Sequence, residues 1–153
     1  SLEIRPGDLL MSRACGSAEL VGSVGLVKNC RRFLMLCDKL FRLLVNKNRV
    51  SSEFLELALK SRSTREQIEQ NLGGAEGLAR NIGQGVIKEL IVCVPPPPEQ
   101  DTIVEHIVKT AAKNYETLKR CRDGIMRLQE YRTALISAAV TGQIDVREEV
   151  GVA

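Results

Sequence analysis

Residues 94–100, Val-Pro-Pro-Pro-Pro-Glu-Gln, divide this 153-residue chain into two parts of different character. Proline lacks a backbone N–H and disfavours helical geometry in the residue before it, so we expect residues 94–98 to be extended. From residue 99 to 140, only Gly124 interrupts an apolar pattern with helical periodicity. The junction therefore predicts three parts: a globular domain (1–98), a long helix (99–142) and a C-terminal tail (143–153).

The composition is typical of a soluble globular protein, with 44% apolar and 27% charged residues. Aromatic residues make up 3% and tryptophan is absent, which argues against recognition by aromatic stacking. The five cysteines have no CxxC spacing, so we expect reduced thiols in the cytoplasm rather than zinc or disulfides. No run of 18 apolar residues and no signal-peptide pattern occurs, so no membrane association is expected.

Short apolar runs in the first part predict a small, irregular, mainly antiparallel sheet in an α+β fold. The glycines at 22 and 25 indicate a bulge or the close approach of another backbone. A Pro-Gly-Asp turn at residues 6–8 precedes the first strand. The expected strands cover residues 9–13, 20–28, 33–37, 40–45 and 90–94.

Two short helices are expected to interrupt this sheet. Ser51-Ser52 is a candidate N-cap for the first, which extends to Arg62. Ser63-Thr64-Arg65-Glu66 fits a capping box for the second, with Gly73 as its stop. Residues 14–19 are expected to form a loop.

A basic run between Lys28 and Arg49 carries seven basic residues against the single acid Asp38. Such an excess can neutralise phosphates and attract a polyanion. The alternative is a strand edge kept soluble by its charges, and the run taken alone favours that alternative.

The segment from residue 73 to 85 contains five glycines but matches no nucleotide-binding loop, because Lys88 stands where the third glycine of GxGxxG is required. Its glycines more plausibly allow a protein neighbour or phosphate group to approach the backbone. After this segment and residues 90–94, the chain enters the proline junction.

The long helix repeats its apolar residues with a heptad period. At roughly 1.5 Å per residue, the helix from 99 to 140 would reach about 63 Å, too long to be covered by so small a domain. We therefore expect a partner helix. The apolar residues of this repeat form a stripe along the helix, which we call the seam. Asn114, Cys121 and Arg132 are its weak or polar positions, and such positions set the register in which two helices pair. The expected pairing residues are Val104, Ile107, Ala111, Leu118, Ile125, Leu128 and Leu135.

No catalytic constellation is present in the sequence. His106, the single histidine, lies within the predicted helix without an identifiable nucleophile or carboxylate partner. No HExxH, DxDxDG or GxSxG motif occurs. We expect no autonomous enzyme, no metal site and no cofactor.

Two segments together resemble the DNA specificity subunit of type I restriction-modification systems. The first is the junction from Leu90 through the prolines to Glu99-Gln100 and Ile103-Val104. The second is Leu128-Gln-Glu-Tyr-Arg-Thr-Ala-Leu-Ile-Ser-Ala-Ala-Val-Thr-Gly-Gln-Ile-Asp145. Pro6-Gly-Asp-Leu-Leu10 and Asp38-Lys-Leu40 also resemble the family's target recognition domain. The resemblance covers nearly the whole chain.

The resemblance implies a non-catalytic domain that reads half of a split double-stranded DNA target, joined to a conserved spacer helix. It also implies methyltransferase and restriction subunits as partners, with the S-adenosylmethionine chemistry in the methyltransferase. The usual subunit has two recognition domains and two antiparallel helices. With one of each, this chain is expected to be a half-subunit or fragment that forms an antiparallel homodimer.

Two function hypotheses follow for the sequence. In the first, the four cations at 28, 31, 32 and 39 of the basic run touch phosphates and loop residues lie near bases, as expected for arginine with guanine and asparagine with adenine. In the second, the chain is a coiled-coil assembly or scaffold module without sequence readout, which the uneven positive charge disfavours. The expected DNA-contact residues are Arg13, Ser17, Lys28, Arg31, Arg32, Lys39, Arg80 and Asn81.

Overall fold

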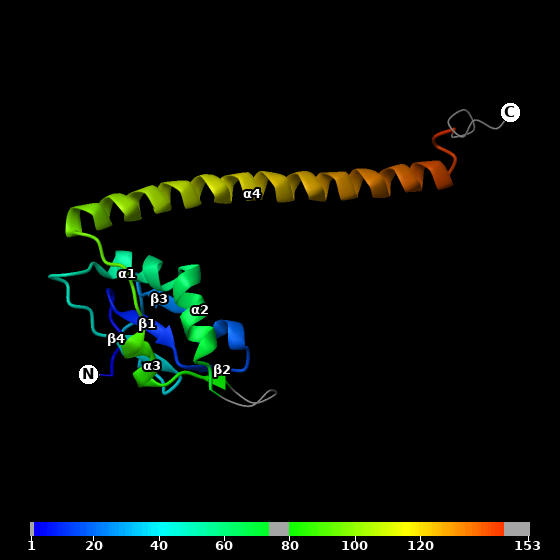
Figure 1. The fold of residues 1–153 in the computed structure, drawn as a ribbon. Coiled ribbons are helices and arrows are strands. Elements are labelled where there is room, and N and C mark those ends of the chain that lie inside the picture. Colours follow the sequence, from blue (N-terminus) through cyan, green and yellow to red (C-terminus); the bar gives the residue numbers. More distant parts are fainter. Residues whose placement is uncertain (1, 74–79, 146–153) are drawn as a thin grey trace. The chain divides into compact units, whose positions relative to one another are not determined.

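The computed structural model describes residues 2–73 and 80–145 (Figure 1). The chain forms two compact units, Ser1–His106 and Ile107–Ala153. The first contains a small antiparallel sheet with short helices, and a long helix follows. The predicted α+β fold class is therefore confirmed.

The three-stranded sheet has β1 (Leu9–Ser12) at its centre, between β3 (Val24–Leu26) and β4 (Leu40–Leu43). Both pairings are antiparallel, and β1 begins where β3 and β4 end. A second sheet pairs β2 (Ala14–Cys15) with β5 (Arg80–Asn81). The segment expected to be a loop at residues 14–19 thus contains β2 and the start of the short 3-10 helix η1 (Ala18–Leu20).

The N-cap of helix α1 (Ser52–Leu59) is Ser51, as predicted, because the Ser51 hydroxyl accepts a hydrogen bond from the Phe54 amide at 3.1 Å. The start predicted for the second helix is wrong by two residues. Helix α2 (Arg62–Gln70) is capped by Ser61, which accepts from the Thr64 amide at 3.4 Å. Ser63 lies inside its first turn.

Two hydrophobic clusters form the core of the first unit. One surrounds Leu9 and Met11 on β1, and the other surrounds Val21, Ile68 and Ile82. Helix α3 (Gln84–Glu89), which the sequence did not predict, contributes to both clusters. The glycines beside and within α3 mask its helical pattern, and packing stabilises it instead.

Gly22 is closely approached, although by the Ile68 side chain and not by the backbone that the sequence predicted. A Cβ at this position would lie 2.8 Å from Cδ1 of Ile68, and the backbone has φ of +79°. Gly25, in contrast, has no neighbour within 4 Å of a Cβ. Gly22 therefore lets α2 pack against the chain entering β3, while the predicted strand over 20–28 is reduced to Val24–Leu26.

The predicted strand at 33–37 is wrong. Among the described residues it takes part in an isolated bridge between Glu3 and Met35 but in no continuous ladder, and Phe33 has φ of +61°, which breaks an extended run. The strand predicted at 90–94 is also absent. There the Gln67 side chain bonds both the amide and the carbonyl of Ile91, at 2.9 and 3.0 Å, in place of a neighbouring strand.

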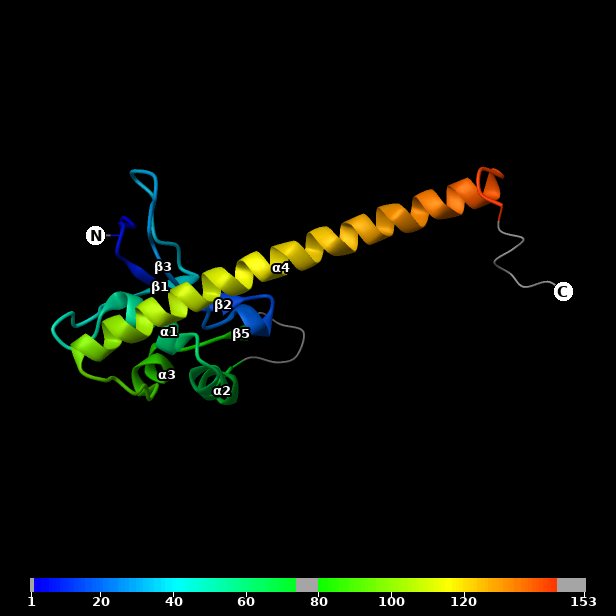
Figure 2. The ribbon, with the colours of Figure 1, turned by 90° about the horizontal axis from the view of Figure 1, so that it is seen from above.

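Helix α4 (Pro97–Val140) is continuous in both views (Figure 1, Figure 2). Pro97 and Pro98, predicted to be extended, form its first turn. Proline fits there because the first amides of a helix have no intrahelical acceptor, and Pro96 accepts from the Gln100 amide at 3.2 Å. After α4, the amides of Gln143 and Ile144 both donate to the Ala138 carbonyl, so the predicted tail begins with a turn that closes the helix. Val146 lies outside the described residues.

Among the described residues, no helix has the length and apolar character required to cross a bilayer. The glycines at 74 and 77 of the predicted glycine-rich segment lie outside the described residues.

Candidate nucleic-acid interface

The residues predicted to contact DNA lie in two groups. Arg13 and Lys39 are at the end of the three-stranded sheet where β1 finishes, and the Arg13 amide donates to the Lys39 carbonyl at 2.7 Å. Arg80 and Asn81 adjoin them through the pairing of β5 with β2. Ser17 lies two residues after the end of β2 and is the N-cap of η1. These five residues form the β2–β5 group.

Arg13 is exposed, and contacts hold its side chain. Its guanidinium lies over the ring of Phe41, 5.6 Å from the centroid, and one NH group is 3.5 Å from the Asp38 carbonyl. Lys39 is also exposed, with its ammonium 3.1 Å from the Asp38 carboxylate. An exposed ion pair of this kind contributes little to stability and is easily exchanged for a phosphate. The cations of this group are therefore accessible to a polyanion.

The second group follows β3 at the opposite end of the sheet. Lys28, Arg31 and Arg32 are all exposed in the segment after Leu26. Arg32 lies 5.7 Å from the centroid of the Phe33 ring. The structure thus separates this group, the β3-end group, from the β2–β5 group.

Two other arginines have structural contacts. Arg42, counted in the basic run, is half-buried: its Nε is 3.0 Å from Asp8, and it donates to the Glu3 carbonyl. Arg65 donates to the carbonyls of Ala18, Glu19 and Val21, which fixes η1 onto α2. Because Arg42 belongs to the basic run, that run offers fewer cations to a ligand than its composition indicates; Arg65 lies outside it.

Glu56 adds a carboxylate close to the β3-end group. Burial alone would raise its pKa, but hydrogen bonds from Lys60 and the Leu26 amide outweigh that effect, with the charges of Lys60 and Lys28 acting in the same direction. The pKa of Glu56 is therefore lowered from 4.5. The ionised carboxylate joins α1 to β3, since its Oε1 accepts from the Leu26 amide at 3.2 Å.

Gln100 is a functional candidate that the sequence interpretation left without a role. Its side chain is 1% exposed. The amide nitrogen donates to the carbonyls of Arg49 and Pro95 at 2.9 and 2.8 Å, and the oxygen accepts from the Ser51 amide at 2.9 Å. The first turn of α4 is thereby bonded to the loop between β4 and α1. The sequence feature that could have identified Gln100 is an uncharged amide side chain directly after the four prolines and Glu99.

A hollow of about 730 Å³ lies beside this loop, between β4, α1, α3 and residues 90–94. Leu43, Leu55, Ile87 and Val92 give it a mainly apolar lining, and Arg49 borders it. Phosphates require N–H donors and positive charge rather than apolar walls. Nucleic-acid contacts are therefore expected on the surrounding loops and not in the hollow.

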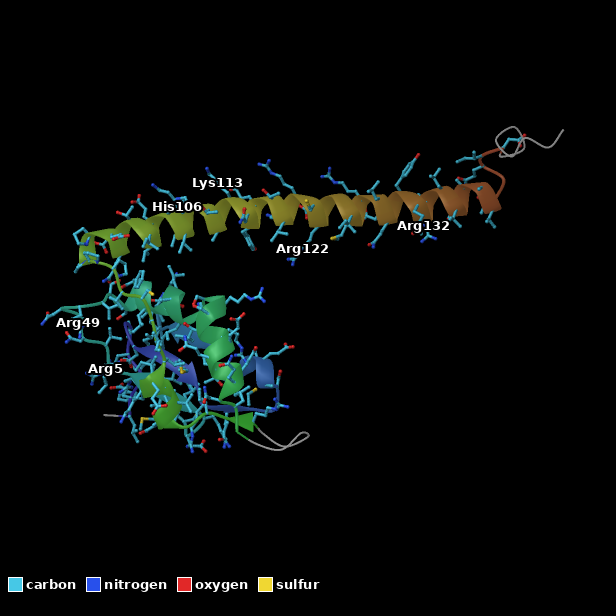
Figure 3. The ribbon with its side chains drawn as sticks, viewed as in Figure 1. Arg5, Arg49, His106, Lys113, Arg122 and Arg132 are labelled. Carbon is cyan, nitrogen blue, oxygen red and sulfur yellow. The ribbon has the colours of Figure 1, made fainter. Side chains whose placement is uncertain are left out.

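The predicted pairing residues of α4 are largely accessible. Val104 is half-buried, whereas the exposed fractions of Ile107, Leu118, Ile125, Leu128 and Leu135 lie between 38% and 68%, and Ala111 is also exposed. Polar side chains of α4 such as His106, Lys113, Arg122 and Arg132 project from the same helix (Figure 3). So many large exposed apolar side chains indicate a surface that a partner covers.

Among the described residues, no group of three or more His, Cys, Asp or Glu side chains is placed to hold a metal ion. His106 is exposed on α4.

Three curated proteins are similar to this chain, and all are specificity subunits of type I restriction enzymes. The EcoKI specificity subunit of Escherichia coli (strain K12) is 28% identical over 143 residues, 93% of this chain and 30% of that protein. The StySPI specificity subunit of Salmonella potsdam is 26% identical over 90% of this chain and 29% of its own length. The EcoEI specificity subunit of Escherichia coli is 29% identical over 69% of this chain and 18% of its own length.

The resemblance inferred from the junction and the terminal segment is thereby confirmed. The chain spans less than a third of the length of these relatives. No protein-family model matches it.

Proposed function

We propose that this chain is a DNA-recognition part of a type I restriction-modification specificity subunit. It acts in the cytoplasm without catalysis or a cofactor of its own, and it positions methyltransferase and restriction subunits on a split DNA target. The observation that carries the proposal is the similarity to two specificity subunits over at least 90% of the chain. The accessible cations at both ends of the sheet support it, because phosphate contacts supply most of the affinity for DNA.

In this proposal, residues 1–98 are the target recognition domain, 99–142 the spacer helix and 143–153 the tail. The β2–β5 group and the β3-end group provide the DNA contacts. Phosphate contacts fix the position of the domain on the duplex, and the side chains of Arg13, Arg80 and Asn81 are candidates for base edges.

We further propose that the exposed seam of α4 pairs with the same seam of a second copy, in antiparallel orientation. In that orientation, residues at heptad position a face residues at position d of the partner helix. With Val104 at position a, Leu118 and Arg132 also fall at a, and Asn114 and Leu128 fall at d. The offset that places Asn114 opposite Arg132 of the second copy also places Leu118 opposite Leu128. Polar residues then meet polar residues and apolar residues meet apolar ones, which favours this register over offsets that oppose Asn114 to isoleucine or leucine.

Light scattering coupled to size-exclusion chromatography tests the pairing. The unchanged chain is expected to elute as a dimer at micromolar concentration. Leu118→Lys should convert it to a monomer, because it introduces a charge into the apolar seam. Glu116→Lys, on the face of α4 away from the seam, is the matched control and should remain dimeric. A stable monomer of the unchanged chain contradicts the pairing.

Sequence-specific binding to duplex DNA tests the recognition role. The chain, together with the methyltransferase subunit, is titrated with duplexes of varied sequence over a range of salt concentrations. Preference for one sequence with a steep salt dependence is expected. A shallow salt dependence without sequence preference would instead support the scaffold interpretation, in which α4 only assembles a complex.

A further inference from the structure

Three segments meet at the end of the sheet where β1 begins and β3 and β4 finish. The turn before β1 carries Arg5, the segment after β3 carries Lys28, and the loop after β4 carries Lys47 and Arg49. All four side chains belong to exposed residues. Arg5 and Arg49 lie on the same side of the first unit in Figure 3. The fold thus gathers cations that are up to 44 residues apart in the sequence.

The acidic residues of the turn before β1 already have partners. The Asp8 carboxylate is 3.0 Å from Nε of Arg42 and accepts from the Arg5 amide at 2.9 Å. The Glu3 carboxylate lies 3.4 Å from the Arg5 guanidinium and accepts from the Phe33 amide at 3.1 Å. These carboxylates therefore offset the positive charges of Arg42 and Arg5. They do not offset the charges of Lys47 and Arg49 in the loop after β4.

That loop, residues 46–49, is fastened by hydrogen bonds. The Asn46 side chain accepts from the Asn48 amide at 3.1 Å, and the Asn46 carbonyl accepts from the Arg49 amide at 2.9 Å. The Gln100 amide adds the bond to the Arg49 carbonyl from the first turn of α4. In the described part of the chain, Lys47 and Arg49 have no ion-pair partner within 4.0 Å. A loop ordered in advance loses little entropy when it binds.

We propose that Lys47 and Arg49 contact phosphates of duplex DNA, and that Gln100 is the positioning residue that holds their loop against the start of α4. Neither cation is among the contacts inferred from the sequence. The inference rests on the proposed function and deepens it, because it links a DNA-contact loop to the spacer helix through a single buried amide. A domain bound to phosphate through this loop would transmit its position to the first turn of α4 through fixed hydrogen bonds.

The double variant Lys47→Ala, Arg49→Ala tests the contacts. Binding of a fluorescently labelled duplex to the chain, together with the methyltransferase subunit, is measured by anisotropy at several KCl concentrations. The slope of log K against log salt should become less steep by about 0.9 for each phosphate that the variant no longer neutralises, which is roughly eightfold in affinity per phosphate at 0.1 M salt. The matched control is Lys113→Ala, Lys119→Ala, which removes the same charge from exposed positions of α4.

A double-mutant cycle tests the role of Gln100. Gln100→Ala should weaken DNA binding in the unchanged chain and have little further effect once Lys47 and Arg49 are replaced, because the loop then has no phosphate-binding side chains to position. Additive effects would instead show that Gln100 acts only on stability. If Gln100→Ala does not fold, the Lys47 and Arg49 variant decides alone, since both residues are exposed.

The outcomes separate this inference from the proposed function. If the unchanged chain binds DNA and the Lys47, Arg49 variant matches the Lys113, Lys119 control in slope, the loop is not a phosphate contact although the proposed function stands. If the unchanged chain, together with the methyltransferase subunit, does not bind any duplex even at low salt, the proposed function itself fails.

Discussion

Replacing Gln100 by alanine is expected to loosen the attachment of the first turn of α4 to the loop before α1. The substitution removes three hydrogen bonds, to the backbone groups of Arg49, Ser51 and Pro95. At about 1 kcal/mol each, their removal should cost roughly 3 kcal/mol, since the side chain is 1% exposed and its partners are left without a donor or acceptor. This is a large share of the roughly 5–15 kcal/mol that stabilises a typical domain.

Urea denaturation followed by circular dichroism measures the total decrease in stability, and hydrogen exchange locates it. Peptides covering residues 46–59 should exchange faster in Gln100→Ala, because the Ser51 amide loses its acceptor and α1 loses a fixed N-cap. Gln129→Ala, at an exposed position of α4, is the matched control. Gln100→Met keeps the volume of the side chain and removes only its polar groups.

The reasoning is refuted if Gln100→Ala and Gln129→Ala have the same urea midpoint and the same exchange over residues 46–59. Recovery of stability in Gln100→Met would show that packing, rather than hydrogen bonding, is what Gln100 provides.

Three further predictions concern the first unit. Gly22→Ala should lower its free energy of unfolding by about 2 kcal/mol, because the new Cβ meets Ile68 at positive φ, whereas Gly25→Ala should cost far less in the same urea titration. The folded-state pKa of Glu56 is depressed, so its contribution is present above pH 4.5 and is lost as the pH falls through the lowered pKa; Glu56→Gln should flatten the acid side of a stability–pH curve. Arg65→Met should cost roughly 2 kcal/mol in thermal denaturation, because three carbonyl acceptors lose their donor.

Elements with local signals were predicted from the sequence. The Ser51 cap of α1 is a contact between residues three apart, and the α4 pattern repeats over many turns, so neither depends on distant parts of the chain. The predicted strand at 90–94 failed because its pairing depends on a distant group. The Gln67 side chain, 24 residues away, takes the hydrogen bonds that a neighbouring strand would have taken at Ile91.

In the candidate interface too, some features follow from the local sequence and others depend on distant parts of the chain. Composition revealed the basic run, but it could not distinguish Arg42, whose charge is taken up by Asp8, from exposed cations such as Arg49. Nor could the order of residues in the sequence indicate that Arg5 and Arg49 lie at the same end of the sheet, because that follows from the pairing of the strands. Burial and partner geometry, which arise only on folding, assign these roles.

A proline junction followed by a long helix can be predicted from the sequence, because proline geometry and heptad periodicity are local properties. The way in which that junction is held depends on contacts between distant residues. Two of its prolines enter the helix, and Gln100 turns inward to bond three backbone groups that belong to the loop before α1 and to Pro95. A buried amide side chain requires hydrogen-bond partners, and only folding brings residues 49 and 51 within reach of residue 100.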